Sequence, residues 1–138
     1  MSGERVQLVK EGYDAWNAGD RGWVLRHMSP DAEWISPPED PEPGHYRGHE
    51  EIQAFWKQWR TEVGQLHFDP VEIIESDDHV IVVTKRRGRG EQSGLQVSDK
   101  IVQVFTFDGQ TCVKVQEFYD RRKALQSVGI ATEEAGAG

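Results

Sequence analysis

The chain has 138 residues, a formal net charge of −8 and a single cysteine, Cys112. This length fits one domain, and one cysteine excludes both an internal disulfide and a cysteine-based zinc framework. The acidic balance argues against nucleic acid as a partner, no apolar run of about 18 residues suits a membrane helix, and an unpaired thiol favours a cytoplasmic protein.

Two helices are predicted at the start of the chain. The first covers residues 4–18, where apolar side chains recur at intervals of three and four. Gly19 suits the left-handed conformation that ends a helix, and Asp20 suits the N-cap of a second, short helix that runs to about His27. The apolar face of the first helix consists of Val6, Val9, Tyr13 and Trp16.

The next segment combines a short strand, a loop and a long helix. Residues 29–31 read as a turn, and a strand with Trp34 on one face is predicted over 32–36. Residues 37–44 hold four prolines and three acidic residues, so we expect an exposed loop there. A helix from Gly48 to Gly64 is predicted by an apolar stripe that consists of Ile52, Phe55, Trp56, Trp59 and Val63.

From residue 67 the apolar period changes to two, which predicts strands. Turns are expected at 76–78, at 88–94 and at the dipeptide Asp108-Gly109, which is a strong hairpin signal. These turns separate four strands, predicted at 67–75, 79–89, 95–107 and 111–119.

The remaining segment closes the domain. Asp120 is expected to cap a helix over 121–127, so that residues 1–128 form a single domain and 129–138 a flexible tail. Helices followed by an antiparallel meander predict an α+β fold. We expect about three N-terminal helices packed on a curved, mostly antiparallel sheet, a short C-terminal helix, and a hollow for a ligand at the open end of the sheet.

Five segments of the chain resemble the SnoaL-like branch of the nuclear-transport-factor-2-like superfamily, and they occur in the order of that family. The resemblance covers roughly residues 4–130. It implies a cone-shaped roll with the helices over the concave sheet face, and a homodimer formed through the convex face. Because this superfold hosts isomerases, cyclases, dehydratases and non-enzymatic binders, it does not identify an activity. The segments are 13–20, 29–34, 46–48, 105–109 and 118–121.

The catalytic positions of two relatives carry over only in part. In the resemblance to ketosteroid isomerase, the positions of its tyrosine, its aspartate base and its second aspartate fall on Gly12, Ser36 and Gln103. All three residues are replaced, so steroid-isomerase chemistry by these positions is not expected. In the resemblance to SnoaL-type polyketide cyclases, the histidine and aspartate positions fall on Gln103 and Glu117. The carboxylate is therefore retained as a longer homologue, whereas the histidine is replaced.

Glu117 is the candidate catalytic residue. By the alternation of a strand it shares a face with Val113, Val115 and Tyr119, and the two valines indicate that this face is buried. Burial raises the pKa of a carboxyl group, which makes it useful as an acid or base near neutral pH. Alternatively, Glu117 pairs with an arginine or lies at a hydrated rim.

Gln103 is the second candidate catalytic residue. It lies between Ile101 and Phe105 on the inward face of its strand, where it would orient Glu117 or donate to a substrate carbonyl. A core amide bonded to a neighbouring backbone is the alternative.

Arg86, Arg87 and Arg89 lie near the end of the strand predicted at 79–89. Because Arg86 points opposite to Arg87 and Arg89, at least one faces the cavity, where it would pair with Glu117, Asp99 or an anionic ligand. The alternative is a solvated edge with surface ion pairs, and Asp99 itself is expected to be exposed.

The aromatic residues are candidates for the wall of a ligand site, although most of them would also suit a core. By alternation Cys112 lies on the opposite face of the strand from Glu117, and it is expected to be inert. The five histidines are scattered, so neither a metal nor a cofactor is predicted. The candidate ligand-binding residues are Tyr13, Trp16, Trp34, Phe55, Trp56, Trp59, Phe105 and Tyr119.

These features favour a cofactor-independent isomerase, cyclase or lyase. It would act on a small hydrophobic cyclic compound, polyketide-like or steroid-like. Glu117 would be the acid or base, and Gln103 with Tyr13 or Tyr119 would polarise the substrate oxygen. Two alternatives remain open: a non-catalytic binder of a small hydrophobic ligand, and a dimeric interaction module whose cavity is filled by side chains. A cavity far below a few hundred Å³ would favour the interaction module.

Overall fold

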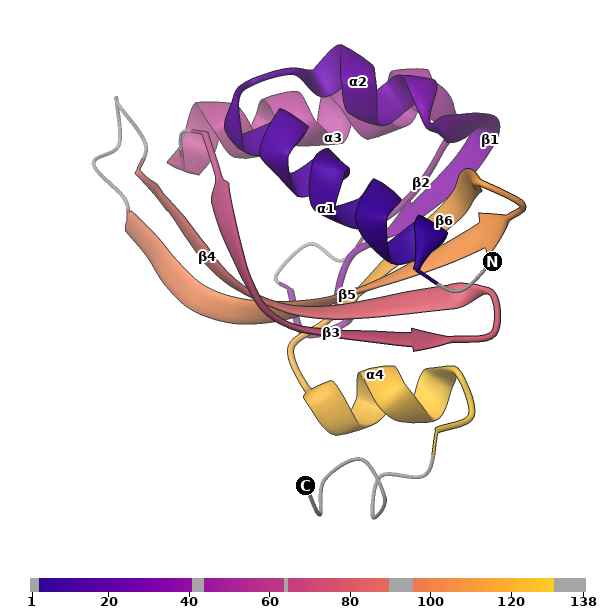
Figure 1. Ribbon diagram of the computed structural model, residues 1–138. Coiled ribbons are helices and arrows are strands. Elements are labelled where there is room, and N and C mark those ends of the chain that lie inside the picture. Colours follow the sequence, from indigo (N-terminus) through magenta and orange to yellow (C-terminus); the bar gives the residue numbers. More distant parts are fainter. Residues whose placement is uncertain (1–2, 41–43, 64, 90–95, 131–138) are drawn as a thin grey trace.

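The computed structural model of the protein describes residues 3–40, 44–63, 65–89 and 96–130. In these ranges, three helices cover the concave face of a six-stranded sheet and a fourth helix lies on its other face (Figure 1). The helices are α1 (Glu4–Asn17), α2 (Arg21–Arg26), α3 (Gly48–Val63) and α4 (Arg121–Ser127). The strands are β1 (Met28–Ile35), β2 (His45–Arg47), β3 (His67–Ser76), β4 (His79–Arg89), β5 (Gln96–Asp108) and β6 (Thr111–Phe118).

The helix ends follow the predicted capping residues. Gly19 has a φ of 87°, which ends α1 in the left-handed region. The Asp20 side chain accepts a hydrogen bond from the backbone N–H of Trp23, and the Asp120 side chain accepts one from Arg122. These side chains satisfy backbone donors that the first turns of α2 and α4 leave without partners.

The sheet has the strand order β2-β1-β6-β5-β4-β3, and only the pair β1–β6 is parallel. The predicted α+β architecture is thus confirmed. β6 lies between β1 and β5 in the middle of the sheet, and Glu117 of β6 is directly opposite Gln103 of β5.

The prediction of a turn at residues 29–31 is wrong, because β1 runs through them. The register between β1 and β6 shifts between Met28 and Glu33. Pro30 lies in this irregular stretch, where its missing N–H removes no regular ladder bond. The short strand β2 was not predicted; it pairs with residues 33–35 of β1.

The proline-rich loop is less exposed than its composition indicates. Pro37 is buried, whereas Pro38 and Glu39 are exposed as predicted. Ser36 binds Gly44 through both its backbone N–H and its hydroxyl, which closes the base of the loop beside Pro37. Residues 41–43 lie outside the described part of the chain.

The sheet separates two apolar clusters. The larger one lies between α1–α3 and the concave face, and the smaller one packs α4 against Ile81, Val102 and Val104 on the opposite face. Ile130 also packs against the smaller cluster. The turn predicted at 88–94 begins too early, because β4 runs to Arg89, and its residues 90–94 lie outside the described residues, as do residues 131–138 of the predicted tail.

No helix within the described ranges has both the length and the apolar character needed to cross a membrane.

Candidate functional site

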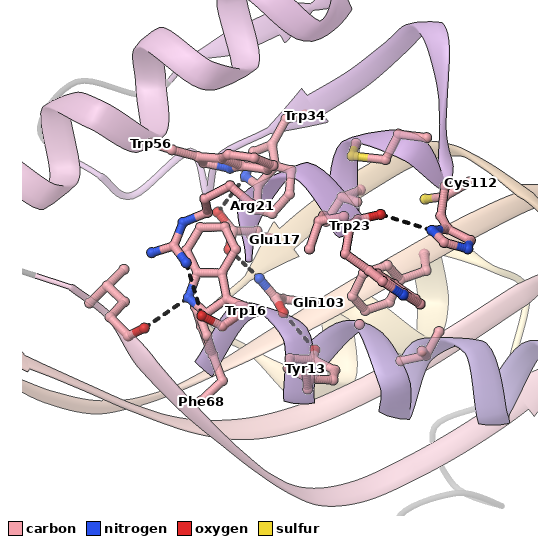
Figure 2. A pocket seen from close by; sticks show the side chains of 18 of the residues that line it. Tyr13, Trp16, Arg21, Trp23, Trp34, Trp56, Phe68, Gln103, Cys112 and Glu117 are labelled. Carbon is pink, nitrogen blue, oxygen red and sulfur yellow. Dashed lines mark hydrogen bonds between the residues drawn. The ribbon is translucent and has the colours of Figure 1, made fainter. Parts of the chain in front are cut away.

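A cavity of about 100 Å³ lies between helices α1–α3 and the concave face of the sheet. Aromatic and aliphatic side chains form most of its wall, and Glu117 and Gln103 lie among them (Figure 2). Seven of the eight predicted ligand-binding residues line it, and their role in binding stays a prediction. They are Tyr13, Trp16, Trp34, Phe55, Trp56, Trp59 and Phe105.

The Glu117 carboxyl group is buried and held by two donors from neighbouring strands. Its residue is 5% exposed. The indole Nε1 of Trp34 donates to Oε1 at 3.0 Å, and Nε2 of Gln103 donates to Oε2 at 2.8 Å (Figure 2). Each carboxyl oxygen thus uses one acceptor site on the protein and keeps another for a molecule in the cavity.

The orientation of Gln103 is fixed by Tyr13 of α1. The buried Tyr13 hydroxyl donates to Oε1 of Gln103 at 2.6 Å, so the amide nitrogen faces Glu117. Burial and the charge of Glu117 hold the pKa of Tyr13 well above its usual range, which keeps the phenol protonated as a donor. Gln103 thus contacts Glu117 as the alternation predicted, and its role in orienting that residue stays a prediction.

The pKa of Glu117 is raised above the ordinary value of a glutamate. Burial is the largest cause, because the ionised form loses its hydration. The hydrogen bonds from Gln103 and Trp34 and the positive charge of Arg86 oppose this effect without cancelling it. Glu117 also lines the cavity, so its neutral form is an acid in the cavity wall.

This raised pKa makes protein stability depend on pH. Above the ordinary value of 4.5, the unfolded chain releases a proton that folded Glu117 retains. The free energy of unfolding therefore falls as pH rises from there to the raised pKa, by about 1.4 kcal/mol per pKa unit of difference. Urea unfolding of wild type and Glu117→Gln between pH 4 and pH 8 should show wild-type stability declining relative to the variant. A difference that is constant with pH would contradict the assignment.

Of the arginines predicted in β4, Arg86 faces the cavity. It is 5% exposed and forms two hydrogen bonds, of 3.0 and 2.8 Å, with the carboxylate of Asp99, which is itself more exposed. Its guanidinium lies 5.3 Å from the centre of the Trp59 ring. The alternative of a solvated edge is thus wrong for Arg86 but correct for Arg87, which is exposed and lies 3.5 Å from Asp69.

The side chain of Arg89 lies outside the described part of the chain.

Tyr119 does not line the cavity, contrary to the prediction. β6 ends at Phe118, so the alternation that directs Glu117 inward does not extend to the next residue of the same parity. Tyr119 is 38% exposed, and its hydroxyl donates to the carboxylate of Asp40 in the proline-rich loop.

Cys112 lies on the cavity side of β6, whereas the alternation predicted the opposite face. Thr106 pairs with Lys114 but Phe107 pairs with Cys112, so Val113 is an extra residue that resets the alternation. Burial raises the pKa of Cys112 to about 12. The thiol therefore stays protonated at neutral pH and is inert as a nucleophile.

Several residues of the cavity wall were not predicted from the sequence. Phe107 shares the parity of Phe105, so alternation along β5 is the signal that places it in the wall. Phe68, Met28 and Trp23 join the wall through the packing of β3, β1 and α2, and nothing in the local pattern indicated this. Among the residues described, no group of three His, Cys, Asp or Glu side chains is arranged to hold a metal ion.

The sequence of the chain matches a known domain family. The sequence model of the SnoaL-like domain matches residues 9–115. A structure of an NTF2-like protein of unknown function from Burkholderia pseudomallei is similar, with 26% identity and a TM-score of 0.74 over 91% of this chain and 97% of that one. No curated protein matched the chain in sequence.

Two more distant structures share the fold. A putative SnoaL-like polyketide cyclase from a Jannaschia species is 20% identical, with a TM-score of 0.71 over 92% of each chain. A protein with a ketosteroid isomerase-like fold from Catenulispora acidiphila, in complex with trimethylamine, is 14% identical, with a TM-score of 0.69 over 96% of this chain and 98% of that one.

Proposed function

Because the chain belongs to the SnoaL-like domain family, we propose that it is an enzyme that moves a proton within a small, hydrophobic, oxygenated substrate. The Glu117 carboxylate takes a proton from a carbon beside the substrate carbonyl. The resulting carboxylic acid returns this proton to another carbon of the same molecule. The reaction needs no change in oxidation state and belongs to the isomerases.

One observation carries this proposal: an ionisable carboxyl group is buried in the wall of an apolar cavity. An apolar core would be at least as stable without Glu117, since burying a carboxylate destabilises a protein unless it is paired. Here the pairing consists of two neutral donors, from Trp34 and Gln103, and each carboxyl oxygen keeps an acceptor site for a ligand. This combination is typical of a carboxylate that acts as a general acid or base.

Of the donors expected for the substrate oxygen, only Gln103 remains, because neither tyrosine is available. The Tyr13 hydroxyl already donates to Gln103, and Tyr119 lies outside the cavity. Gln103 has two amide hydrogens, of which one goes to Glu117. The second is the donor that we assign to the negative charge developing on the substrate oxygen.

The volume of the cavity limits the substrate. An apolar cavity of about 150 Å³ holds benzene, and the cavity here measures about 100 Å³. A polycyclic steroid or polyketide would thus require the helices or their aromatic side chains to move apart. We therefore assign a substrate whose buried part is a single ring or a short branched chain.

The test uses two unconjugated ketones of this size, 3-cyclohexen-1-one and 4-penten-2-one. Both become conjugated when a proton moves from the carbon next to the carbonyl to the far end of the double bond. We expect the protein to accelerate the rise in ultraviolet absorption and to introduce deuterium from D₂O, as seen by NMR. Rates equal to those in acetate buffer with an equal amount of a catalytically inert protein would contradict the proposal.

The same small volume favours a second candidate, an interaction module whose interior is not used. For this candidate neither proton exchange nor binding of a small ligand is expected. A non-catalytic binder would instead release a bound compound chemically unchanged. Mass spectrometry of compounds that copurify with the protein, together with the exchange assay, separates the three outcomes.

A further inference from the structure

One side of the cavity combines two arginines with a buried indole N–H. Arg21 of α2, Arg60 of α3 and Trp56 of α3 all line the cavity there. Two of them contact Trp16, whose ring centre lies 4.9 Å from that of Trp56 and 3.7 Å from the guanidinium of Arg21. Figure 2 shows Arg21 lying against Trp16.

The two arginines are close enough to repel each other. Arg21 is partly buried, and its pKa is lowered first by burial and then by the charge of Arg60. Arg86, the third arginine of the cavity, is neutralised by Asp99. In the ranges that the structure describes, neither Arg21 nor Arg60 forms an ion pair with a carboxylate, although the chain as a whole has a net charge of −8.

The Trp56 indole is a third donor without an acceptor. Trp56 is 7% exposed, and its Nε1 has no hydrogen-bond partner among the described residues. Arg60 follows it by four positions on α3, so the two side chains lie on the same face of that helix. A buried N–H without a partner destabilises a protein, and an acceptor supplied by a ligand would remove this penalty.

A structural role explains only part of this arrangement. One guanidinium nitrogen of Arg21 donates to the backbone oxygen of Trp16, near the C-terminal end of α1, where a positive charge is favourable. This contact uses one of its five N–H groups. It accounts neither for the second arginine nor for the unpaired indole of Trp56.

We propose that Arg21, Arg60 and the Trp56 indole form a binding site for the carboxylate of a small organic acid, whose apolar part enters the cavity toward Glu117. Two arginines match the oxygens of a carboxylate, and the indole N–H adds a third donor. This inference rests on the proposed function in one respect only, that the apolar part of the ligand is the part that reacts.

The probes are 3-methylbutanoate and its neutral amide, 3-methylbutanamide, which have the same apolar part. Binding is measured by NMR titration of the tryptophan indole and backbone amide signals. We expect the acid to bind about tenfold or more tightly than the amide, since hydrogen bonds to charged groups exceed neutral ones in strength. The indole signal of Trp56 should shift with the acid.

Variants locate the preference for the acid. Arg21→Gln is expected to lower the affinity for 3-methylbutanoate about tenfold, and the exposed Arg60→Gln a few-fold, because solvent screens its charge. Arg26→Gln removes the same charge from α2 outside the cavity and should change the affinity less than about twofold. Circular dichroism confirms that each variant is folded.

Three results would overturn the inference: equal affinities for acid and amide, equal losses in Arg21→Gln and Arg26→Gln, or tighter binding of 2-methylpropyl phosphate than of the carboxylate. Glu117→Gln is expected to keep the preference for the acid. If the protein prefers the acid to the amide but introduces no deuterium into the two ketones, that result would count against the proposed function and not against the carboxylate site.

Discussion

Replacing Glu117 by glutamine is expected to slow the isomerisation of 3-cyclohexen-1-one and 4-penten-2-one by about 10²–10⁴-fold, the usual contribution of a general acid or base. The amide that results neither takes nor returns a proton near neutral pH. It also cannot accept from both donors at once, because Trp34 Nε1 and Gln103 Nε2 each direct an N–H at one carboxyl oxygen. The measurement is the initial rate with saturating ketone.

Two further variants complete this experiment. Glu33→Gln removes a carboxylate from β1, where Glu33 is bound to His45 outside the cavity, and should leave the rate within about twofold of wild type. Glu117→Asp keeps the acid on a shorter chain and should retain more activity than Glu117→Gln. A loss below twofold in folded Glu117→Gln would refute the role of this residue.

The pairing of Glu117 with Gln103 was predictable in part, because both lie in regular parts of neighbouring strands. Alternation assigned each to the inward face, and the short hairpin after Asp108 makes β5 and β6 neighbours. Their direct pairing was not predictable in full, because it also needs the extra residue Val113, which shifts the register of the hairpin by one residue. The hydrogen bond from Trp34 to Glu117 was not predictable from the local sequence. It depends on β1 lying parallel to β6, a contact between residues 83 positions apart.

Alternation failed wherever a strand was irregular or had ended. The extra residue Val113 turned Cys112 inward, and the end of β6 at Phe118 released Tyr119 toward Asp40. A bulge leaves no clear mark in a short sequence, since its extra residue needs no special side chain. The face of a residue is thus least predictable at the ends of strands.

The polar side of the cavity was the least predictable feature. Arg21 and Arg60 belong to different helices, and each looks like a surface residue in its own segment. Their shared position depends on how α2 and α3 pack over the sheet. The volume of the cavity depends on the same packing, so composition and periodicity could indicate a hollow but not its size.

Shortening Leu125 to alanine is expected to lower the free energy of unfolding by about 2–5 kcal/mol, without changing the isomerisation rate per folded molecule. The Leu125 side chain is fully buried between α4 and the sheet face opposite the cavity, where it packs in a cluster with Ile81, Val102 and Val104. The other faces of β4 and β5 carry Val82 and Gln103 toward the cavity, so the site should stay intact while the domain loses stability.

Urea unfolding followed by tryptophan fluorescence measures this effect, because all five tryptophans line the cavity. Gln126→Ala changes the adjacent exposed residue of α4 and should alter stability by less than about 0.5 kcal/mol. A loss below about 1 kcal/mol in Leu125→Ala would show that α4 is not part of the cooperative core. A lower rate in the folded variant would show that the two faces of the sheet are coupled, and the face opposite the cavity would then be a place from which a partner could regulate Glu117.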